Sequence, residues 1–173
     1  PAGGVAMGWQ LAMRSKSPYG PYEWKKVMWQ GKTDVNGPHQ GAWVDTQTGE
    51  DWFIHFQDVY AAGRIIHLQP MKWVEDWPVI GNETGKFEGE PVKTYKKPNV
   101  GAVYDICCPD ASDDFSGGKL GLQWQWNANF KEEWYSFKDS MLILNAVKKT
   151  DESISDVRNL LLQKWCVPQF DAL

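Results

Sequence analysis

Four short runs of apolar or alternating residues, separated by three tight turns, fill residues 36–80. The turns lie at residues 47–50, 60–63 and 74–76. Short runs rich in β-branched and aromatic side chains predict strands, and connections this short make neighbouring strands antiparallel. Four such strands in a unit of this size are typical of one blade of a β-propeller. Because a blade must pack on neighbouring blades, we expect the protein to contain more chain than these 173 residues.

The sequence on either side of this blade predicts less regular structure. Residues 9–14 alternate, with Trp9, Leu11 and Met13 on one face, and predict a strand. Residues 27–29 predict a short edge strand, so residues 1–29 resemble the last half of a preceding blade. Residues 81–91 are polar and glycine-rich, and residues 93–98 carry three lysines and a proline. Both segments predict a linker on the surface.

A second pattern of strands begins at residue 112. Strands are predicted within residues 120–127, 134–137, 141–147 and 160–166, and a helical turn within 153–158. Leu122, Trp124 and Trp126 alternate strictly with polar residues in the first of these runs. Strands at this spacing, with almost no helix, favour four strands of one sheet at the beginning of a β-sandwich.

The expected architecture is therefore all-β, in three parts. Residues 1–92 form a partial propeller, made of the end of one blade and one full blade. Residues 93–111 form a linker, and residues 112–173 form a partial C-terminal β-sandwich. Charge supports this division, because residues 1–98 hold 11 basic and 11 acidic groups whereas residues 99–173 hold 7 and 11. The whole net charge of −4 thus falls after Pro98.

Composition also argues against two kinds of partner. Basic residues are not clustered, which argues against nucleic acid. No apolar run approaches the length of a membrane-spanning helix, so we expect no membrane partner. The chain starts without Met and shows no signal peptide, and both ends look cut, so localisation is left open.

The aromatic residues and the cysteines each bear on how the core of the protein is built. The 11 Trp and 6 Tyr residues suit either sugar stacking or a crowded β core, and for any one Trp the core is favoured. The three cysteines are Cys107, Cys108 and Cys166. An odd count that includes two adjacent residues is a poor disulfide framework, so free and partly buried thiols are predicted.

Two residues stand where strand ends meet the central channel of a propeller. His39 follows Gly-Pro at the mouth of a blade strand. Arg64 begins another strand, and its guanidinium can make several directed hydrogen bonds to hydroxyl or carboxylate oxygens. A salt bridge from Arg64 to Asp58 is an equal alternative. His55 and His67 lie inside strands and are interpreted as structural. No carboxylate of the blade is marked by its position as a general acid or base.

Long motifs spread over nearly the whole chain resemble those of one enzyme family. They include Gly37-Pro38-His39-Gln40-Gly41, His55-Phe56-Gln57-Asp58, Gly63-Arg64, Trp77-Pro78-Val79-Ile80 and Leu120-Gly121-Leu122-Gln123-Trp124-Gln125-Trp126-Asn127. The family is glycoside hydrolase family 43, in the branch that contains β-xylosidases and α-L-arabinofuranosidases. The resemblance implies a five-bladed propeller, of which this chain holds the last part, followed by the beginning of a concanavalin-like sandwich.

The resemblance also implies an activity and a set of roles. Family members hydrolyse glycosidic bonds with inversion, using an Asp as general base, a Glu as general acid and a second Asp that tunes the pKa of the Glu. All three positions are expected before residue 1, so no catalytic residue is expected in this chain. Arg64 matches the arginine that binds the sugar, and the loop with Gly4 and Val5 lines the pocket. His39 matches a histidine that contacts a structural calcium ion, mostly water-coordinated, since calcium prefers oxygen ligands.

Two functions follow as alternatives. The chain is part of an inverting glycosidase acting on xylan-derived oligosaccharides or arabinose-substituted xylan, with no organic cofactor. Its partners are then a xylo- or arabino-oligosaccharide substrate and the remainder of the same protein. The alternative is a non-catalytic carbohydrate-binding or structural β module, because the catalytic carboxylates are expected elsewhere.

Overall fold

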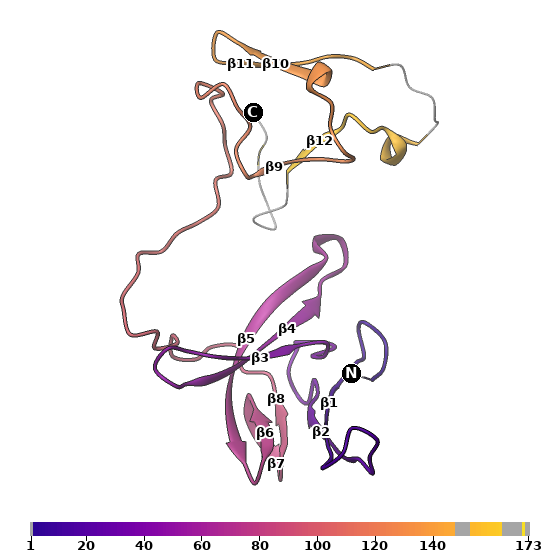
Figure 1. The fold of residues 1–173 in the computed structure, drawn as a ribbon, viewed down its shortest axis with the longest axis vertical. Coiled ribbons are helices and arrows are strands. Elements are labelled where there is room, and N and C mark those ends of the chain that lie inside the picture. Colours follow the sequence, from indigo (N-terminus) through magenta and orange to yellow (C-terminus); the bar gives the residue numbers. More distant parts are fainter. Residues whose placement is uncertain (1, 148–152, 164–170, 172–173) are drawn as a thin grey trace. The chain divides into compact units, whose positions relative to one another are not determined.

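The computed structural model describes residues 2–147, 153–163 and 171, which fall into two compact units. One unit ends at Tyr104 and the other begins at Asp105, inside the predicted linker (Figure 1). Regular structure in the described residues consists of strands and three single 3-10 turns, which confirms the all-β class. None of the described helices has the length and apolar content that a membrane span requires.

The predicted blade is a four-stranded antiparallel sheet in the order β3-β4-β5-β6. Its strands are β3 (Ala42–Asp45), β4 (Asp51–Asp58), β5 (Arg64–Val74) and β6 (Trp77–Ile80). A single 3-10 turn, η1 (Tyr60–Ala62), joins β4 to β5. The register places Asp58 opposite Arg64 at one end of the sheet and Asp51 opposite Met71 near the other. The prediction of four antiparallel strands separated by short turns is confirmed.

The other sheet of this unit has the order β1-β2-β8-β7. It contains β1 (Gln10–Arg14), β2 (Glu23–Met28), β7 (Asn82–Gly85) and β8 (Glu88–Glu90). Two predictions were wrong here. Residues 27–29 are not a short edge strand, because β2 is six residues long and has β1 on one side and β8 on the other. Residues 81–91 are not a surface linker, because they form the hairpin β7-β8 that widens this sheet.

Both errors arise because the types of the residues in these segments do not reveal how the segments pack. The ammonium group of Lys25 in β2 lies over the rings of Trp77 and Phe87, at 4.8 and 4.7 Å from their centroids. A lysine can cover aromatic surface with its stem in this way, so a polar sequence still forms an inner strand. In β8, a Cβ on Gly89 would collide with the carbonyl oxygen of Ile80. This glycine permits a close backbone approach and does not mark a loop.

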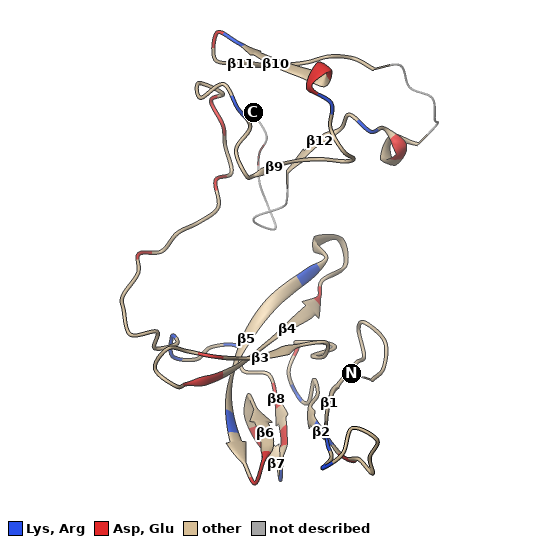
Figure 2. Cartoon of the chain, in the orientation of Figure 1, with Lys and Arg blue, Asp and Glu red and all other residues tan. Residues whose placement is uncertain are grey.

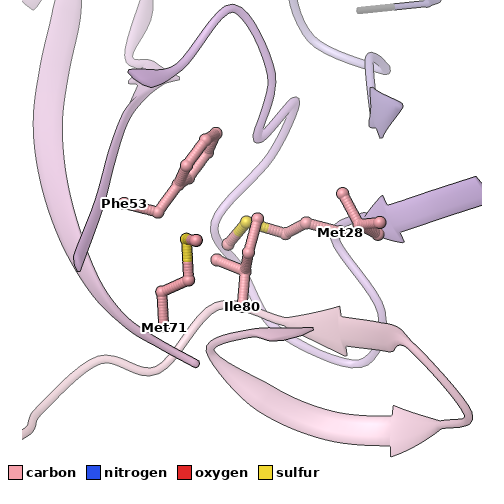
Figure 3. Packing of buried hydrophobic residues seen from close by; sticks show 5 residues of the cluster. Met28, Phe53, Met71 and Ile80 are labelled. Carbon is pink, nitrogen blue, oxygen red and sulfur yellow. The ribbon is translucent and has the colours of Figure 1, made fainter. Parts of the chain in front are cut away.

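A cluster of buried side chains joins the two sheets. Val27 and Met28 of β2 pack with Phe53, Met71 and Ile80 of the blade. Figure 3 shows the side chains of Met28, Phe53, Met71 and Ile80 pointing toward one another. Each of the five is at most 8% exposed. Burying one such side chain contributes about 1.5–3 kcal/mol. This cluster therefore fixes the blade against the first sheet and so holds its strand ends in place.

The second unit, described by itself, contains two pairs of antiparallel strands. They are β9 (Trp124–Trp126) with β12 (Leu161–Gln163), and β10 (Tyr135–Lys138) with β11 (Met141–Leu144). The 3-10 turns η2 (Glu132–Trp134) and η3 (Ile154–Asp156) complete the described structure, and η3 lies in the predicted helical turn. The four strands were predicted as one sheet, but the described residues form two separate pairs.

Aromatic side chains fill the interior of this second unit. The ring centroid of Trp126 lies 5.8 Å from that of Trp134 and 5.4 Å from that of Tyr135. Trp134 is 6% exposed. Aromatic pairs at these distances are worth about 0.5–1.5 kcal/mol beyond their buried area. The core interpretation of tryptophan therefore holds for Trp134, whereas Trp126 is half-buried beside it.

The described cysteines are free but not buried. Cys107 and Cys108 are both exposed, so the prediction of partly buried thiols was wrong for them. They lie in a stretch without strands or helices, where neighbouring elements cannot cover them. The prediction for Cys166 concerns a residue outside the described part of the chain.

Candidate functional site

The candidate site lies at the end of the blade where β3 begins and where β4 turns into β5. Antiparallel pairing places the start of β3, Ala42, beside Ile54 of β4. The chain just before β3 therefore runs alongside the last residues of β4. Asn36 fixes this approach, since its side-chain Nδ2 donates to the carbonyl oxygen of Asp58 at 3.0 Å and its Oδ1 accepts from the Asp58 backbone N–H at 3.0 Å.

His39 is buried in this corner with its ring orientation fixed. The side chain is 3% exposed, and its Nδ1 lies 2.7 Å from the carbonyl oxygen of Gly37. A carbonyl oxygen can only accept, so Nδ1 carries the proton of the neutral ring. The lone pair is then on Nε2, which makes Nε2 the atom able to accept a hydrogen bond or to coordinate a metal ion.

Arg64 packs on the ring of Phe56, which also contacts His39. The guanidinium carbon is 4.4 Å from the ring centroid of Phe56, and the His39 ring centroid is 5.1 Å from it. Phe56 is 5% exposed, whereas Arg64 is exposed. The two residues predicted from the sequence are therefore brought together through Phe56. A cation over an aromatic face is attracted by about 0.5–1 kcal/mol at an exposed site.

The alternative role of Arg64, a salt bridge to Asp58, is not formed in the described residues. The two residues face each other directly across β4 and β5, but the ion pairs found in that part of the chain do not include Arg64. The guanidinium instead packs on Phe56 and keeps its hydrogen-bond donors accessible. This geometry suits an arginine that donates hydrogen bonds to a ligand oxygen.

The loop that contains Gly4 and Val5 reaches the same corner. A Cβ on Gly37 would collide with the carbonyl oxygen of Val5, and a Cβ on Gly8 would collide with the ring of His39. These two glycines thus let the loop pack against the segment that carries the histidine. Space around the Cα of Gly4 is open, and Val5 is 40% exposed. The loop is held beside His39 with part of its surface accessible.

Phe56 was not singled out from the sequence, although a signal for it existed. It lies two residues before Asp58 on β4, so it shares a sheet face with the residue opposite Arg64. Residues two apart on one face, next to a strand end with a candidate arginine, predict contact across the pair. That signal can be used only when the pairing register of β4 and β5 is known, and the sequence alone does not give this register.

Two histidines occupy the opposite face of the same strands. His55 and His67 are direct cross-strand partners, with parallel rings 5.3 Å apart. Burial lowers the pKa of His55 from 6.5 to about 4 and also lowers the pKa of His67. His67 Nε2 lies 3.0 Å from Oε1 of Gln57. His55 is buried and His67 is half-buried, and their stacking is consistent with the structural role expected from the sequence.

The carboxylates of the blade serve mainly as hydrogen-bond acceptors. Asp51 accepts from the indole N–H of Trp43 at 2.7 Å, and Glu50 accepts from the indole N–H of Trp52 at 3.2 Å. Within residues 2–147, 153–163 and 171, no three His, Cys, Asp or Glu side chains are grouped to enclose a metal ion. A metal ion bound at His39 would therefore need other ligands.

Comparison with known proteins places both parts of the chain in one family. Residues 2–78 match the family model described as glycosyl hydrolases family 43. Residues 112–173 match the model described as the beta xylosidase C-terminal concanavalin A-like domain. These two matches agree with a propeller part followed by a sandwich part.

Individual relatives agree with the family models. A putative beta-xylosidase of Xylanibacter ruminicola is 46% identical over 167 residues, which cover 95% of this chain and 31% of that protein. A bifunctional family 43 protein of Bacteroides eggerthii has a similar structure, with a TM-score of 0.68 and 30% identity over 89% of this chain and 19% of that one.

A third relative is a solved family 43 enzyme engineered to display both endo-xylanase and exo-arabinofuranosidase activity. Its TM-score is 0.66 at 28% identity, over 93% of this chain and 32% of that one. The chain thus spans about a third or less of the length of these relatives. Its two matched domains and its all-β fold show that the chain belongs to glycoside hydrolase family 43.

Proposed function

We propose that this chain is part of an inverting glycoside hydrolase that acts on xylan-derived oligosaccharides or arabinose-substituted xylan. The observation that carries the proposal is the contact of both His39 and Arg64 with Phe56, at one end of a family 43 blade. The similarity to a putative beta-xylosidase and to an enzyme with exo-arabinofuranosidase activity supports this substrate class.

In this proposal, the described residues bind and orient the sugar. Arg64 donates charge-assisted hydrogen bonds to sugar hydroxyls, and the ring of Phe56 packs against its guanidinium group. Gly4 and Val5 line the pocket from the neighbouring loop. Orientation of the terminal sugar lowers the barrier because the reacting atoms are held close to their transition-state positions.

The bond-breaking step needs two carboxyl groups, which we place outside residues 1–173. A carboxylate removes a proton from water, and the water oxygen attacks the anomeric carbon. A carboxylic acid on the other side donates its proton to the glycosidic oxygen, which leaves with its electron pair. A second Asp, also outside this chain, sets the pKa of that acid. Attack from the face opposite the leaving group inverts the anomeric configuration.

We also propose that His39 takes part in a calcium site. The proton on Nδ1 leaves Nε2 free to contact the ion or a water molecule bound to it. Calcium takes most of its ligands from oxygen, so a single imidazole fits only an ion coordinated mostly by water. When bound, such an ion supplies positive charge and rigidity at the base of the pocket.

Hydrolysis by the complete protein tests the proposed function. We expect turnover of an aryl β-D-xyloside or an aryl α-L-arabinofuranoside, and proton NMR of the first-formed sugar should show the inverted anomer. A retained anomer would contradict the inverting mechanism. Failure to hydrolyse both substrates would contradict the enzyme proposal and favour the non-catalytic carbohydrate-binding alternative. The chain of residues 1–173 alone should show no turnover.

A further inference from the structure

A hollow of the blade lies at the opposite end of β4 and β5 from Arg64. It has a volume of about 430 Å³ and combines aromatic rings with charged groups.

 The residues that matter in it are Trp52, Trp73, Tyr95, Glu50, Asp51 and Lys96. Tyr95 and Lys72 also line a neighbouring hollow of 240 Å³, so the two hollows adjoin.

One wall of this hollow is formed by the segment after β8, which is tied to the blade by Glu50. The Glu50 carboxylate accepts from Lys96 Nζ at 2.9 Å and from the backbone N–H of Asn99 at 2.9 Å. These hydrogen bonds lower the pKa of Glu50, the one from Asn99 most strongly. Thr48 adds a third tie, because its hydroxyl donates to the carbonyl oxygen of Asn99 at 2.6 Å. The wall is therefore fixed by several contacts.

Each exposed aromatic ring of the hollow is supported by a second ring. Tyr95 is 56% exposed and meets Trp52 edge-on, with centroids 5.8 Å apart, while Trp52 is 3% exposed. Trp73 is 47% exposed and meets Trp43 edge-on at 5.6 Å. The indole N–H of Trp43 is held in turn by Asp51. Supported rings of this kind present fixed apolar surfaces to a ligand.

We propose that this hollow is a second carbohydrate-binding site, which holds a segment of a xylan chain. The apolar faces of pyranose rings pack on Trp73 and Tyr95, and the charged groups of Lys72, Lys96 and Asp51 exchange hydrogen bonds with hydroxyls. A site that combines aromatic surface with a few placed polar groups is typical of small-ligand recognition. The choice of xylan rests on the proposed function, whereas the site itself rests on the geometry of the hollow.

The second site is separate from the candidate active site. Asp51 and Asp58 are seven positions apart along β4, which corresponds to about 23 Å along the strand. One terminal sugar bound at Arg64 cannot reach Trp73 over that distance. The hollow therefore retains polymer near the enzyme and takes no part in bond cleavage. Basic and acidic residues are dispersed along the described chain and not gathered on one element, which fits a neutral ligand (Figure 2).

Affinity electrophoresis of the complete protein in gels that contain soluble xylan tests this proposal. Trp73→Ala and Tyr95→Ala should each raise the dissociation constant about tenfold, as expected for loss of one aromatic contact. Tyr95→Phe keeps the ring and should bind like wild type. Matched controls are Trp24→Ala and Tyr19→Ala, which remove exposed rings elsewhere (64% and 97% exposed) and should leave retardation unchanged.

The outcomes separate this inference from the proposed function. Wild-type protein that xylan does not retard, or a Trp73→Ala variant retarded like wild type, would overturn the second site. If Tyr95→Ala fails to fold, Trp73→Ala decides alone. Trp73→Ala should keep the wild-type kcat/KM on an aryl glycoside. Retardation without hydrolysis of aryl glycosides would overturn the proposed enzyme but leave this site standing.

Discussion

Acidification should destabilise the blade through one buried imidazole, that of His55. The side chain is 2% exposed, and its Nδ1 donates to the carbonyl oxygen of Phe56 at 2.9 Å. Its Nε2 is buried and has no hydrogen-bond partner within the described residues. Protonation of Nε2 would place a cation there without an acceptor, next to the stacked ring of His67. Burial therefore lowers the pKa of His55 from 6.5 to about 4.

The sign and size of the effect follow from linkage. Between pH 6.5 and 4, the unfolded chain binds a proton at His55 that the folded chain does not, so stability falls as the pH falls. Each pKa unit corresponds to about 1.4 kcal/mol, which gives a loss of about 2 kcal/mol between pH 8 and pH 5 and about 3 kcal/mol below pH 4.

Comparison of wild type with His55→Phe isolates this contribution. Phenylalanine keeps a flat ring against His67 but cannot bind a proton, and the contributions of the carboxylates cancel in the difference. The free energy of unfolding, measured by urea denaturation of the complete protein at pH 8 and pH 5, should fall by about 2 kcal/mol more in wild type. Equal losses in the two proteins would refute the reasoning.

Three further variants test the candidate site and the core. A chelator should lower the melting temperature of wild type more than that of His39→Ala, because an ion bound only by the folded state stabilises it; equal shifts would exclude the metal role. Phe56→Leu should raise KM about threefold by removing the ring beneath Arg64, and Phe56→Tyr should restore it; an unchanged KM in Phe56→Leu would show that the ring does not position the guanidinium. Ile80→Ala should cost about 2–5 kcal/mol of unfolding free energy, measured by urea denaturation, since Ile80 is 1% exposed; a loss below about 1 kcal/mol would contradict its place in the core.

The blade could be predicted from the sequence because local signals agreed there. Alternation with a period of two, β-branched and aromatic residues, and short turns all specified antiparallel strands over residues 36–80. Antiparallel order then places the start of β3 and the turn from β4 to β5 at one end. The proximity of His39 and Arg64 to that end follows from this order, before any side-chain contact is known.

Other features depended on contacts between distant parts of the chain. The hairpin β7-β8 is rich in glycine and charge, and only its packing on β2 and on the carbonyl of Ile80 explains it as a strand pair. Lys25 looks like a surface residue until its position over Trp77 and Phe87 is seen. The sequence contains no local signal for such long-range partners. Assignment from hydrophobic periodicity and turn residues alone is therefore wrong for these segments.

Steady-state kinetics of Arg64→Ala in the complete protein test the central claim most directly. Loss of charge-assisted hydrogen bonds to the sugar should cost about 2–4 kcal/mol of transition-state stabilisation. On an aryl xyloside or arabinofuranoside, kcat/KM should therefore fall roughly 30- to 1,000-fold. The melting temperature should stay near that of wild type because Arg64 is exposed. Arg64→Lys should rescue poorly, since lysine lacks the planar fork, and Asp58→Ala should be near normal. Near-normal kcat/KM in Arg64→Ala would contradict the account.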